Sequence, residues 1–291
     1  MTATAVYGRA ESQNLSTTIF INGMLCSSEA LYGITNIHVT QLEGVDTMLF
    51  KSVFQTPRST PIAAYFLETG AIPIRFILKG RRLMYLWTIL QKDDEDLVSK
   101  VFKAQKLFPV KDDFINQIKE DKEDIGLNLE DEDIKLMKKS KFKTLVKEKI
   151  RGAAHCYLIE KKESLSKLKN LSSEFNLKEY LLTDKLSTSE KQLLFKLRTR
   201  MIPVKGNFSS MYKDDLSCHL CNMNLKESQE HLLSCSFLTH VNEGSSVEYL
   251  DIYHTNLEKQ IRAVKHWSIL LKTRTIKLNE MKLLSREARR T

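Results

Sequence analysis

From residue 36 onward, apolar side chains in this sequence recur every three or four positions. This spacing places them on one face of an α-helix, whereas the alternation of apolar and polar residues that is typical of β-strands is scarce. Ten glycines and five prolines are also few for 291 residues, which argues against a turn-rich β-sandwich, collagen or a low-complexity chain. The sequence therefore predicts a mainly α protein made of helical hairpins and bundles.

Three helices are predicted between residues 36 and 91. The first covers 36–54, and its apolar face is formed by Leu42, Val45, Met48, Leu49 and Val53. The second runs from a cap at Ser59 or Thr60 to Gly70, with Pro61 in its first turn. The third opens at Pro73, and its apolar face is formed by Ile74, Ile77, Leu78, Leu83, Leu86, Trp87 and Leu90.

The rest of the chain is predicted to be equally helical. Two short helices fall within 96–125, a long helix covers 140–165, and another covers 255–280. Between the long helices, a capping-box pattern at Ser187 opens a helix that Pro203 and Gly206 stop. Its expected inner residues are Leu193, Leu194 and Leu197, and its expected outer residues are Lys191, Arg198 and Arg200.

Charge is distributed unevenly along the chain. Lys and Arg number 45 against 36 Asp and Glu, so the formal net charge is +9. Residues 93–133 hold fourteen acidic and six basic residues, 135–213 hold seven acidic and twenty basic, and 255–291 hold three acidic and ten basic. The acidic stretch is interpreted as solvated helix faces, and the basic balance hints at a polyanionic partner.

The chain carries five cysteines, and three of them fall between residues 218 and 235. Together with a histidine they form the pattern C-x2-C-x9-H-x3-C, made of Cys218, Cys221, His231 and Cys235. One turn can present two thiols that are separated by two residues, and a His and a Cys four residues apart lie on one side of a helical turn. Because zinc takes four nitrogen or sulfur ligands in a tetrahedron, the pattern predicts a closed, structural Zn2+ site.

Two alternatives to this ligand set stay open. The three cysteines and His231 could be ordinary core residues, and His219 or His240 could replace His231. Of these substitutes, His219 lies between two of the thiols and His240 lies outside the segment. Cys26 and Cys156 stand alone in the sequence and are predicted to be small buried residues.

Cysteine use and hydropathy also bear on location. An odd number of clustered cysteines is not a disulfide framework, so we expect a reducing, intracellular compartment, either nucleus or cytoplasm. No apolar run approaches about 18 residues, so no membrane-spanning helix and no membrane partner are expected. The N-terminal residues lack the basic and apolar regions of a secretory signal.

Residues 212–215, Tyr-Lys-Asp-Asp, match the Y-x-D-D form of a polymerase hairpin. That chemistry needs Asp214 and Asp215 on a tight turn between apolar strands, with a third carboxylate upstream. Here the flanking residues are polar and cysteine-bearing, and a predicted helix precedes them. We therefore interpret the segment as a solvated loop that leads into the zinc module, and no catalytic residue is assigned.

Two blocks of this sequence resemble the C-terminal part of LINE-type (non-LTR) retrotransposon reverse transcriptases. The first block contains SEALYGIT and then QLEGVDTMLFKSVFQTPRSTPIAAYFLETGAIPIRFILKGRRLMYLWTIL, and it is similar to the helical thumb that follows the palm. The second contains EKQLLFKLRTRMIPVKGNF and then C-x2-C…EHLLSC, and it is similar to the zinc-binding region. The blocks occur in the family's order and cover most of residues 27–235.

The resemblance implies that the chain corresponds to the thumb and zinc-binding portion of such a protein, without its fingers and palm. The implied parts are a remnant of the palm–thumb junction (1–35), a thumb-like helical bundle (36–133), a basic helical connector (134–210), the zinc module (211–240) and a basic C-terminal helix and tail (241–291). In that family this region grips template–primer duplex and element RNA. We therefore expect RNA or an RNA–DNA duplex as partner, with the absent palm and fingers as a second candidate. We expect no polymerase activity from this chain and no small-molecule substrate.

Phosphate contact requires Lys and Arg on the outer face of helices whose apolar face is packed. Two clusters fit this layout: Arg75, Lys79, Arg81 and Arg82, and then Lys191, Lys196, Arg198, Arg200 and Lys205. Each residue can equally be part of an ordinary solvated face, so the prediction concerns the collective surface. Phe208 and Trp87 are candidates for base stacking, but Trp87 lies on an apolar stripe and is predicted to be core.

Three other hypotheses stay open beside this nucleic-acid-binding role. The chain could belong to an active RNA-directed DNA polymerase in which Asp214 and Asp215 take part. It could be a helical protein-interaction scaffold, with the acidic 93–133 paired to the basic 135–213. It could also be the product of a decayed element that has no function.

Overall fold

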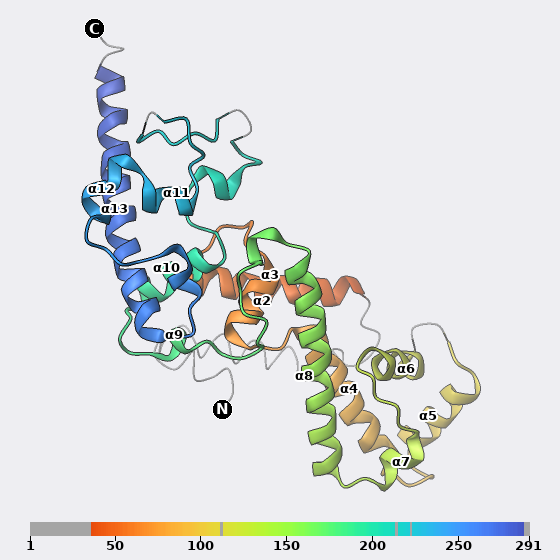
Figure 1. Cartoon of the computed structure of the whole chain (residues 1–291). Coiled ribbons are helices and arrows are strands. Elements are labelled where there is room, and N and C mark those ends of the chain that lie inside the picture. Colours follow the sequence, from red (N-terminus) through yellow and green to blue (C-terminus); the bar gives the residue numbers. More distant parts are fainter. Residues whose placement is uncertain (1–35, 111–112, 213–214, 222, 288–291) are drawn as a thin grey trace. The chain divides into compact units, whose positions relative to one another are not determined.

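The computed structural model describes residues 36–110, 113–212, 215–221 and 223–287. Within these ranges there are twelve α-helices and no β-strand, and an isolated antiparallel bridge joins Ser217 to Lys226. The predicted mainly α fold is confirmed (Figure 1). The described residues form two compact units, one that includes 36–50 and 70–161 and one that includes 51–69 and 162–287.

From α2 to α8 the helices follow one another with short connections, and several of the connections after α8 are longer. The N-terminal elements are α2 (Asn36–Phe54), α3 (Ile62–Thr69) and α4 (Ile74–Leu90). The next are α5 (Leu97–Leu107), α6 (Phe114–Asp124), α7 (Asp131–Leu136) and α8 (Lys139–Glu163). The C-terminal elements are α9 (Glu179–Leu182), α10 (Thr188–Arg198), the 3-10 turn η4 (Lys205–Phe208), α11 (Gln229–Ser234), α12 (Thr239–Asn242), the 3-10 turn η6 (Tyr249–Tyr253) and α13 (Leu257–Glu287).

The helix ends agree with the punctuation in the sequence. Pro73 directly precedes α4, and Gly70, directly after α3, has the positive φ of 65° that glycine adopts without strain. Ser187 caps α10 in a capping box with Glu190, in which each side chain accepts from the other residue's backbone N–H. These local signals mark the starts of α4 and α10 and the end of α3. The ends of α10 at Arg198 and of α13 at Glu287 differ from the predicted stops at Pro203 and at residue 280.

The inner face of α2 differs from the predicted one. Met48 and Val53 were expected inside, but they are 64% and 42% exposed. Thr47, Phe50 and Phe54 are buried instead, and Phe54 stacks on Phe195 with ring centroids 4.1 Å apart. The helix therefore lies rotated so that its large aromatic residues, rather than Met48 and Val53, are removed from water.

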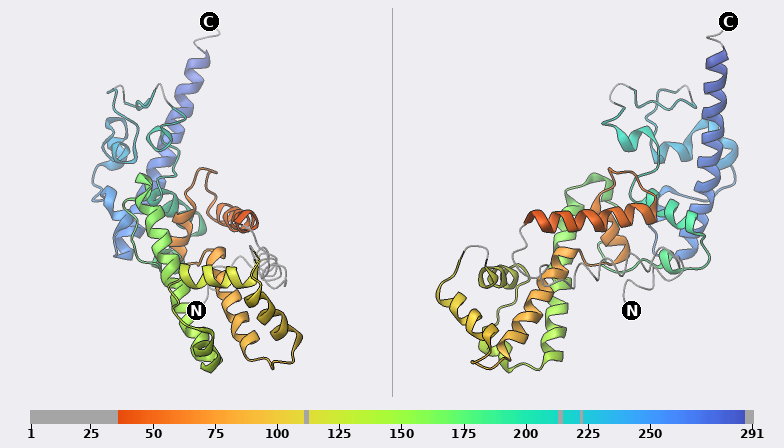
Figure 2. Two further views of the ribbon diagram at one scale, coloured as in Figure 1. Left: turned by 90° about the vertical axis from the view of Figure 1, so that its right-hand side faces the viewer. Right: turned by 180° about the vertical axis from the view of Figure 1, so that it is seen from behind.

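In the first unit, α4 is the central helix. Its Gly80 faces Ile150 and Val146 of α8, and its Tyr85 contacts Phe114 of α6 edge to face at 5.8 Å. Figure 2 shows α4 and α8 side by side, with α5 to α7 next to them. The core side of α8 is a stripe at four-residue spacing, formed by Phe142, Val146, Ile150, Ala154 and Leu158.

In the second unit, α13 packs on α9, α10 and η6. Val264, Trp267 and Leu270 of α13 are fully buried, and Phe195 of α10 stacks on Tyr65 of α3 at 5.2 Å. The last buried residue that the structure describes in α13 is Arg274, and the helix continues beyond it to Glu287. This grouping places the cysteine-bearing segment with α10 and α13, whereas α8 belongs with α4 to α7.

A search of the described residues finds no helix with both the length and the apolar character that crossing a membrane requires.

Candidate metal centre

The four residues of the cysteine pattern lie on two short pieces of chain. Cys218 and Cys221 lie on a turn that is closed by a hydrogen bond of 2.8 Å from the Cys218 N–H to the Leu225 carbonyl. His231 lies in the first turn of α11, where its N–H donates to the capping hydroxyl of Ser228 at 3.1 Å. Cys235 directly follows the last residue of α11, so the helix presents His231 and Cys235 toward the turn.

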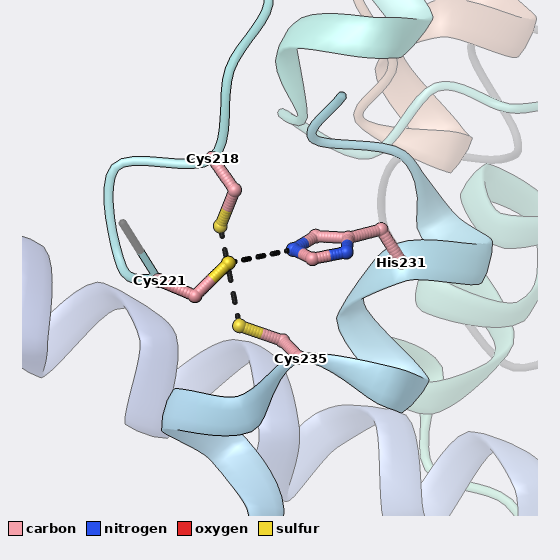
Figure 3. Close-up of side chains that lie close together, drawn as sticks. All are labelled: Cys218, Cys221, His231 and Cys235. Carbon is pink, nitrogen blue, oxygen red and sulfur yellow. Dashed lines mark hydrogen bonds between the residues drawn. The ribbon is translucent and has the colours of Figure 1, made fainter. Parts of the chain in front are cut away.

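The ligand atoms converge on one point (Figure 3). The three sulfurs and a ring nitrogen of His231 all lie within 4.8 Å of one another. The Cys218 and Cys235 sulfurs are 4.0 Å apart, and the Cys221 sulfur is 3.2 Å from the His231 Nε2. Tetrahedral sulfur and nitrogen ligands of zinc, at about 2.0–2.3 Å from the ion, are separated by about 3.5–3.8 Å. The cluster therefore has close to the dimensions that a bound Zn2+ requires.

The cluster is enclosed by protein. Cys218 and Cys221 are each 4% exposed, Cys235 is 1% exposed and His231 is 8% exposed. A set of four nitrogen and sulfur ligands without access for water is typical of a structural rather than a catalytic metal site. These residues form a buried group that could hold a metal ion such as zinc.

Burial governs the electrostatics of the thiols. Desolvation, reinforced by the neighbouring thiols Cys218 and Cys221, raises the pKa of Cys235 to about 12. Desolvation likewise raises the pKa of Cys218. A cation among the three sulfurs would oppose this effect, because it stabilises thiolates.

The alternative histidines lie outside the cluster. His219 is exposed, and its Nε2 lies 2.7 Å from the Asp215 carboxylate. His240 is also exposed. The structure therefore brings His231, and neither substitute, to the three thiols.

The predictions for the two isolated cysteines, Cys26 and Cys156, have different outcomes. The prediction that Cys156 is buried is wrong, because its thiol is exposed. It lies two residues after Ala154 and two before Leu158, and therefore on the opposite side of α8 from the buried stripe. Cys26 lies outside the described residues.

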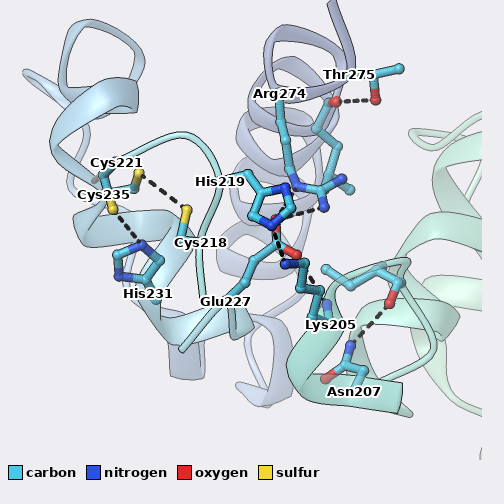
Figure 4. A network of polar contacts seen from close by, with 12 residues as sticks. Lys205, Asn207, Cys218, His219, Cys221, Glu227, His231, Cys235, Arg274 and Thr275 are labelled. Carbon is cyan, nitrogen blue, oxygen red and sulfur yellow. Dashed lines mark hydrogen bonds and ion pairs between the residues drawn. The ribbon is translucent and has the colours of Figure 1, made fainter. Parts of the chain in front are cut away.

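Residues 218–235, which carry the four candidate ligands, are called the metal segment. Its Glu227 connects it to the rest of the second unit (Figure 4). Its carboxylate accepts from Arg274 of α13 at 2.6 and 3.0 Å and from the Lys205 backbone N–H at 3.0 Å. The Gly206 N–H donates to the Glu227 carbonyl at 2.7 Å, and a Cβ at Gly206 would lie only 2.7 Å from that same oxygen. Glycine is thus required where this turn approaches the metal segment.

The Y-x-D-D segment is only partly described, since Lys213 and Asp214 lie outside the described residues. The exposed carboxylate of Asp215 contacts the Lys205 ammonium and the His219 ring, each at 2.7 Å, and accepts from the Ser217 backbone N–H at 2.9 Å. Contacts with Lys205, Ser217 and His219 hold the pKa of Asp215 well below its usual range. Its described contacts are therefore those of a turn that precedes the metal segment.

The first predicted phosphate-binding cluster is largely engaged in internal ion pairs. Arg75 pairs with Glu43, and Lys79 pairs with Asp124 and, at 3.3 Å, with Asp121. Arg82 is buried and donates to both oxygens of Asp121 at 2.6 and 2.8 Å. Arg82 lies four residues after the buried Leu78, so it continues the inner face of α4. Arg81 is half-buried.

The second cluster is similarly engaged. The prediction that Arg198 lies outside is wrong, because it is 3% exposed and donates to both oxygens of Glu68, at 2.9 and 3.0 Å. It lies four residues after the buried Leu194, on the inner face of α10. Three others also have partners, with Arg200 next to Glu230 at 2.5 Å, Lys205 next to Asp215 at 2.7 Å, and Lys191 donating to the Leu181 carbonyl at 3.1 Å. Burial lowers the pKa of Lys196.

The two candidate stacking residues also have protein partners. Trp87 was predicted to be a core residue, but it is only half-buried. Its N–H donates to the Met137 carbonyl at 3.0 Å, and the Lys139 ammonium lies 5.5 Å from its ring centroid. Phe208 is half-buried beneath Lys167 at 5.0 Å. Neither ring is a fully open stacking surface.

Sequence reasoning did not single out one run of exposed basic residues in the first unit. They lie on the N-terminal half of α8, and the excess of Lys and Arg over 135–213 was their only signal.

Comparison with known protein families, with curated proteins and with solved structures finds no match to this chain.

Proposed function

We propose that this chain binds RNA or an RNA–DNA duplex through exposed basic helix faces, and that a structural Zn2+ ion in the Cys3His centre stabilises the second unit. The observation that carries the proposal is a local excess of exposed cations on two helices, α8 and α13. On α8, Lys139, Lys143, Lys147 and Arg151 are exposed at four-residue spacing, and only one acidic residue lies between positions 139 and 151. On α13, Arg262, Lys265 and Lys272 are exposed as well. Such surfaces bind the phosphate backbone with little dependence on sequence.

The zinc assignment is supported by the donor set and its enclosure. Three thiols and one imidazole, all buried, leave no ligand position for a reacting water. We therefore assign the ion a folding role, which in zinc-binding peptides is worth roughly 10–16 kcal/mol of apparent free energy.

The choice of RNA and RNA–DNA duplex is supported by the resemblance to the thumb and zinc-binding region of LINE-type reverse transcriptases. A binding role without catalysis by this chain is further supported by Asp215, whose carboxylate is engaged by Lys205 and His219. The ion pairs found for the acidic 93–133 segment run within that segment, to α4 and to Lys92. They therefore give no specific support to a scaffold that pairs it with 135–213.

Fluorescence anisotropy tests the binding role. With labelled duplex RNA and RNA–DNA duplex, we expect binding at 50 mM salt that weakens at least tenfold by 200 mM salt, because counterions are released from each contacted phosphate. Absence of binding at low salt, or affinity that does not change with salt, would contradict the proposal. Primer extension with Mg2+ is expected to give no product, and metal-dependent synthesis would exclude a purely binding role.

Elemental analysis of two histidine variants tests the zinc assignment. We expect about one zinc per chain in the unmodified protein and in His219→Ala, because the His219 ring lies outside the cluster. His231→Ala removes a ligand and is expected to lose most of the zinc and lower the melting temperature. Equal zinc content in both variants would show that His231 is not a ligand.

A further inference from the structure

A row of four basic residues runs along one side of α8: Lys139, Lys143, Lys147 and Arg151. We call these four residues the basic row. All are exposed, and their four-residue spacing keeps them on one ridge of the helix. Lys143, Lys147 and Arg151 each follow a residue of the buried stripe directly in sequence, so the row runs parallel to the packed side of α8.

The packing of α8 fixes the direction of the basic row. Val146 and Ile150 contact the position of Gly80 on α4, which determines the rotation of α8 about its axis. Lys143 and Lys147 form no ion pair with the part of the chain that the structure describes, in contrast to Arg82 and Arg198. The Lys139 ammonium lies over the Trp87 ring of α4. The first member of the row is therefore positioned close to α4.

The dimensions of the row suit a nucleic-acid backbone. At 1.5 Å rise per residue, successive members are about 6 Å apart and the whole row is about 18 Å long. A duplex carries one phosphate charge per about 1.7 Å of its axis, so about ten phosphates of the two strands fall within the length of the row, and those on the side that faces α8 are within its reach. Each cation can therefore find a phosphate in any register, which gives affinity without sequence preference.

The surroundings of the row favour a duplex over a single strand. Single-strand-binding proteins combine a basic groove with aromatic side chains on which bases stack. The exposed residues of α8 include no aromatic residue along its full described length, 139–163. A straight ridge of cations without a stacking platform matches a regular backbone whose bases are already paired.

We propose that the basic row of α8 is the main duplex-binding surface of this chain, in place of the two clusters predicted on α4 and around α10. This inference rests on the proposed function and specifies its location and its ligand, the phosphate backbone of an RNA or RNA–DNA duplex.

Two matched double variants of the full-length chain test this inference. Lys143→Gln/Lys147→Gln removes two members of the basic row, and Lys141→Gln/Lys149→Gln removes two exposed lysines from the other side of the same helix. All four positions are exposed, so both variants are expected to keep the circular dichroism spectrum and melting temperature of the unmodified protein. Anisotropy is measured with duplex RNA, RNA–DNA duplex and single-stranded RNA between 50 and 200 mM salt, and cosedimentation with phosphatidylserine vesicles is measured in parallel.

The basic-row variant is expected to lose about tenfold or more in duplex affinity. The slope of log affinity against log salt is expected to be shallower by about 2, because each phosphate contact contributes roughly 0.9 to that slope. The other double variant is expected to bind nearly as the unmodified protein does. If the unmodified protein binds duplex and both variants weaken equally, or the basic-row variant does not weaken, this inference is wrong and the proposed function survives. If the unmodified protein binds no nucleic acid, the proposed function fails. In that case, if the unmodified protein binds the vesicles and the basic-row variant does not, the row is assigned to a membrane surface.

Discussion

Two arginines, Arg82 and Arg198, are buried opposite carboxylates in separate units of the chain. Arg82 donates to Asp121 and Arg198 to Glu68, and both carboxylates are 1% exposed or less. Arg198 also donates to the Ile252 carbonyl at 2.6 Å. Removing one member of such a pair leaves an uncompensated charge in a medium of low polarity, which is strongly unfavourable. These residues therefore contribute to the specificity of packing and are not available to an external phosphate.

Replacing Arg198 tests this structural role. We expect Arg198→Ala to lower the free energy of unfolding by about 3–5 kcal/mol, because Glu68 stays buried without a partner. Arg200→Ala is the control, since Arg200 and Glu230 are partly exposed and such pairs contribute about 1 kcal/mol or less. Denaturant titration measures both, and similar losses in the two variants would show that the buried pair is not special.

Asp46 on α2 is expected to make stability depend on pH. Burial, together with the Glu43 carboxylate, raises the pKa of Asp46 from 3.8 to about 6. Folding therefore disfavours its ionised form, so its unfavourable contribution is absent below about pH 4, grows between about pH 4 and pH 6, and is constant at higher pH. Asp46→Asn is expected to stabilise the protein by up to about 3 kcal/mol at pH 7.5 and by little at pH 4. Denaturant midpoints at both pH values provide the measurement, and an equal gain at both would contradict this origin.

At the scale of elements, the helix ends are determined by local chemistry. The capping box of Ser187 and Glu190 satisfies backbone donors that the first turn of α10 leaves without helical partners. In the metal segment, Ser228 performs the same function for α11, whose first turn carries His231. A cap thus orients a proposed metal ligand as well as starting a helix.

The cap of α10 is open to a direct test. Ser187→Ala is expected to lower the free energy of unfolding by about 1 kcal/mol, since it removes the side-chain acceptor from the Glu190 N–H. Ser189→Ala, in the same exposed turn, is expected to change it by a few tenths of a kcal/mol. Thermal melts or denaturant titrations distinguish the two, and a larger effect at Ser189 would show that the capping box does not stabilise α10.

At the scale of the whole molecule, the Cys3His centre belongs to one of the two compact units. Glu227 ties it to Arg274 of α13, and Gln229 donates to the Leu197 carbonyl of α10 at 3.1 Å. Whether the metal segment is folded should therefore affect the stability of α10 and α13. The first unit, with α4 and α8, has its own buried core.

Metal removal is expected to affect the two units differently. Chelation should increase amide hydrogen exchange in α10, α11 and α13, because folding of the metal segment is linked to metal binding. Exchange in α4 and α8 should stay unchanged, and added zinc should restore protection. Hydrogen exchange followed by mass spectrometry reports on each helix, and equal loss of protection in α4 and α8 would show that the centre stabilises the whole chain.

The sequence alone determined those features that depend on near neighbours. The helical class and the caps at Ser187 and Gly70 follow from residue spacings within one or two turns, and the C-x2-C-x9-H-x3-C pattern named the candidate ligands. The fold then chose His231 over His219 and His240. The rotation of α2 and the burial of Arg82 and Arg198 were decided by tertiary structure, because a charge can enter the core only where a distant carboxylate meets it. Glu227 and Arg274 are 47 residues apart, and no local pattern indicates that pair. For the same reason, basic residues of α4 and α10 that meet a carboxylate are enclosed, whereas the basic row of α8 stays exposed to solvent.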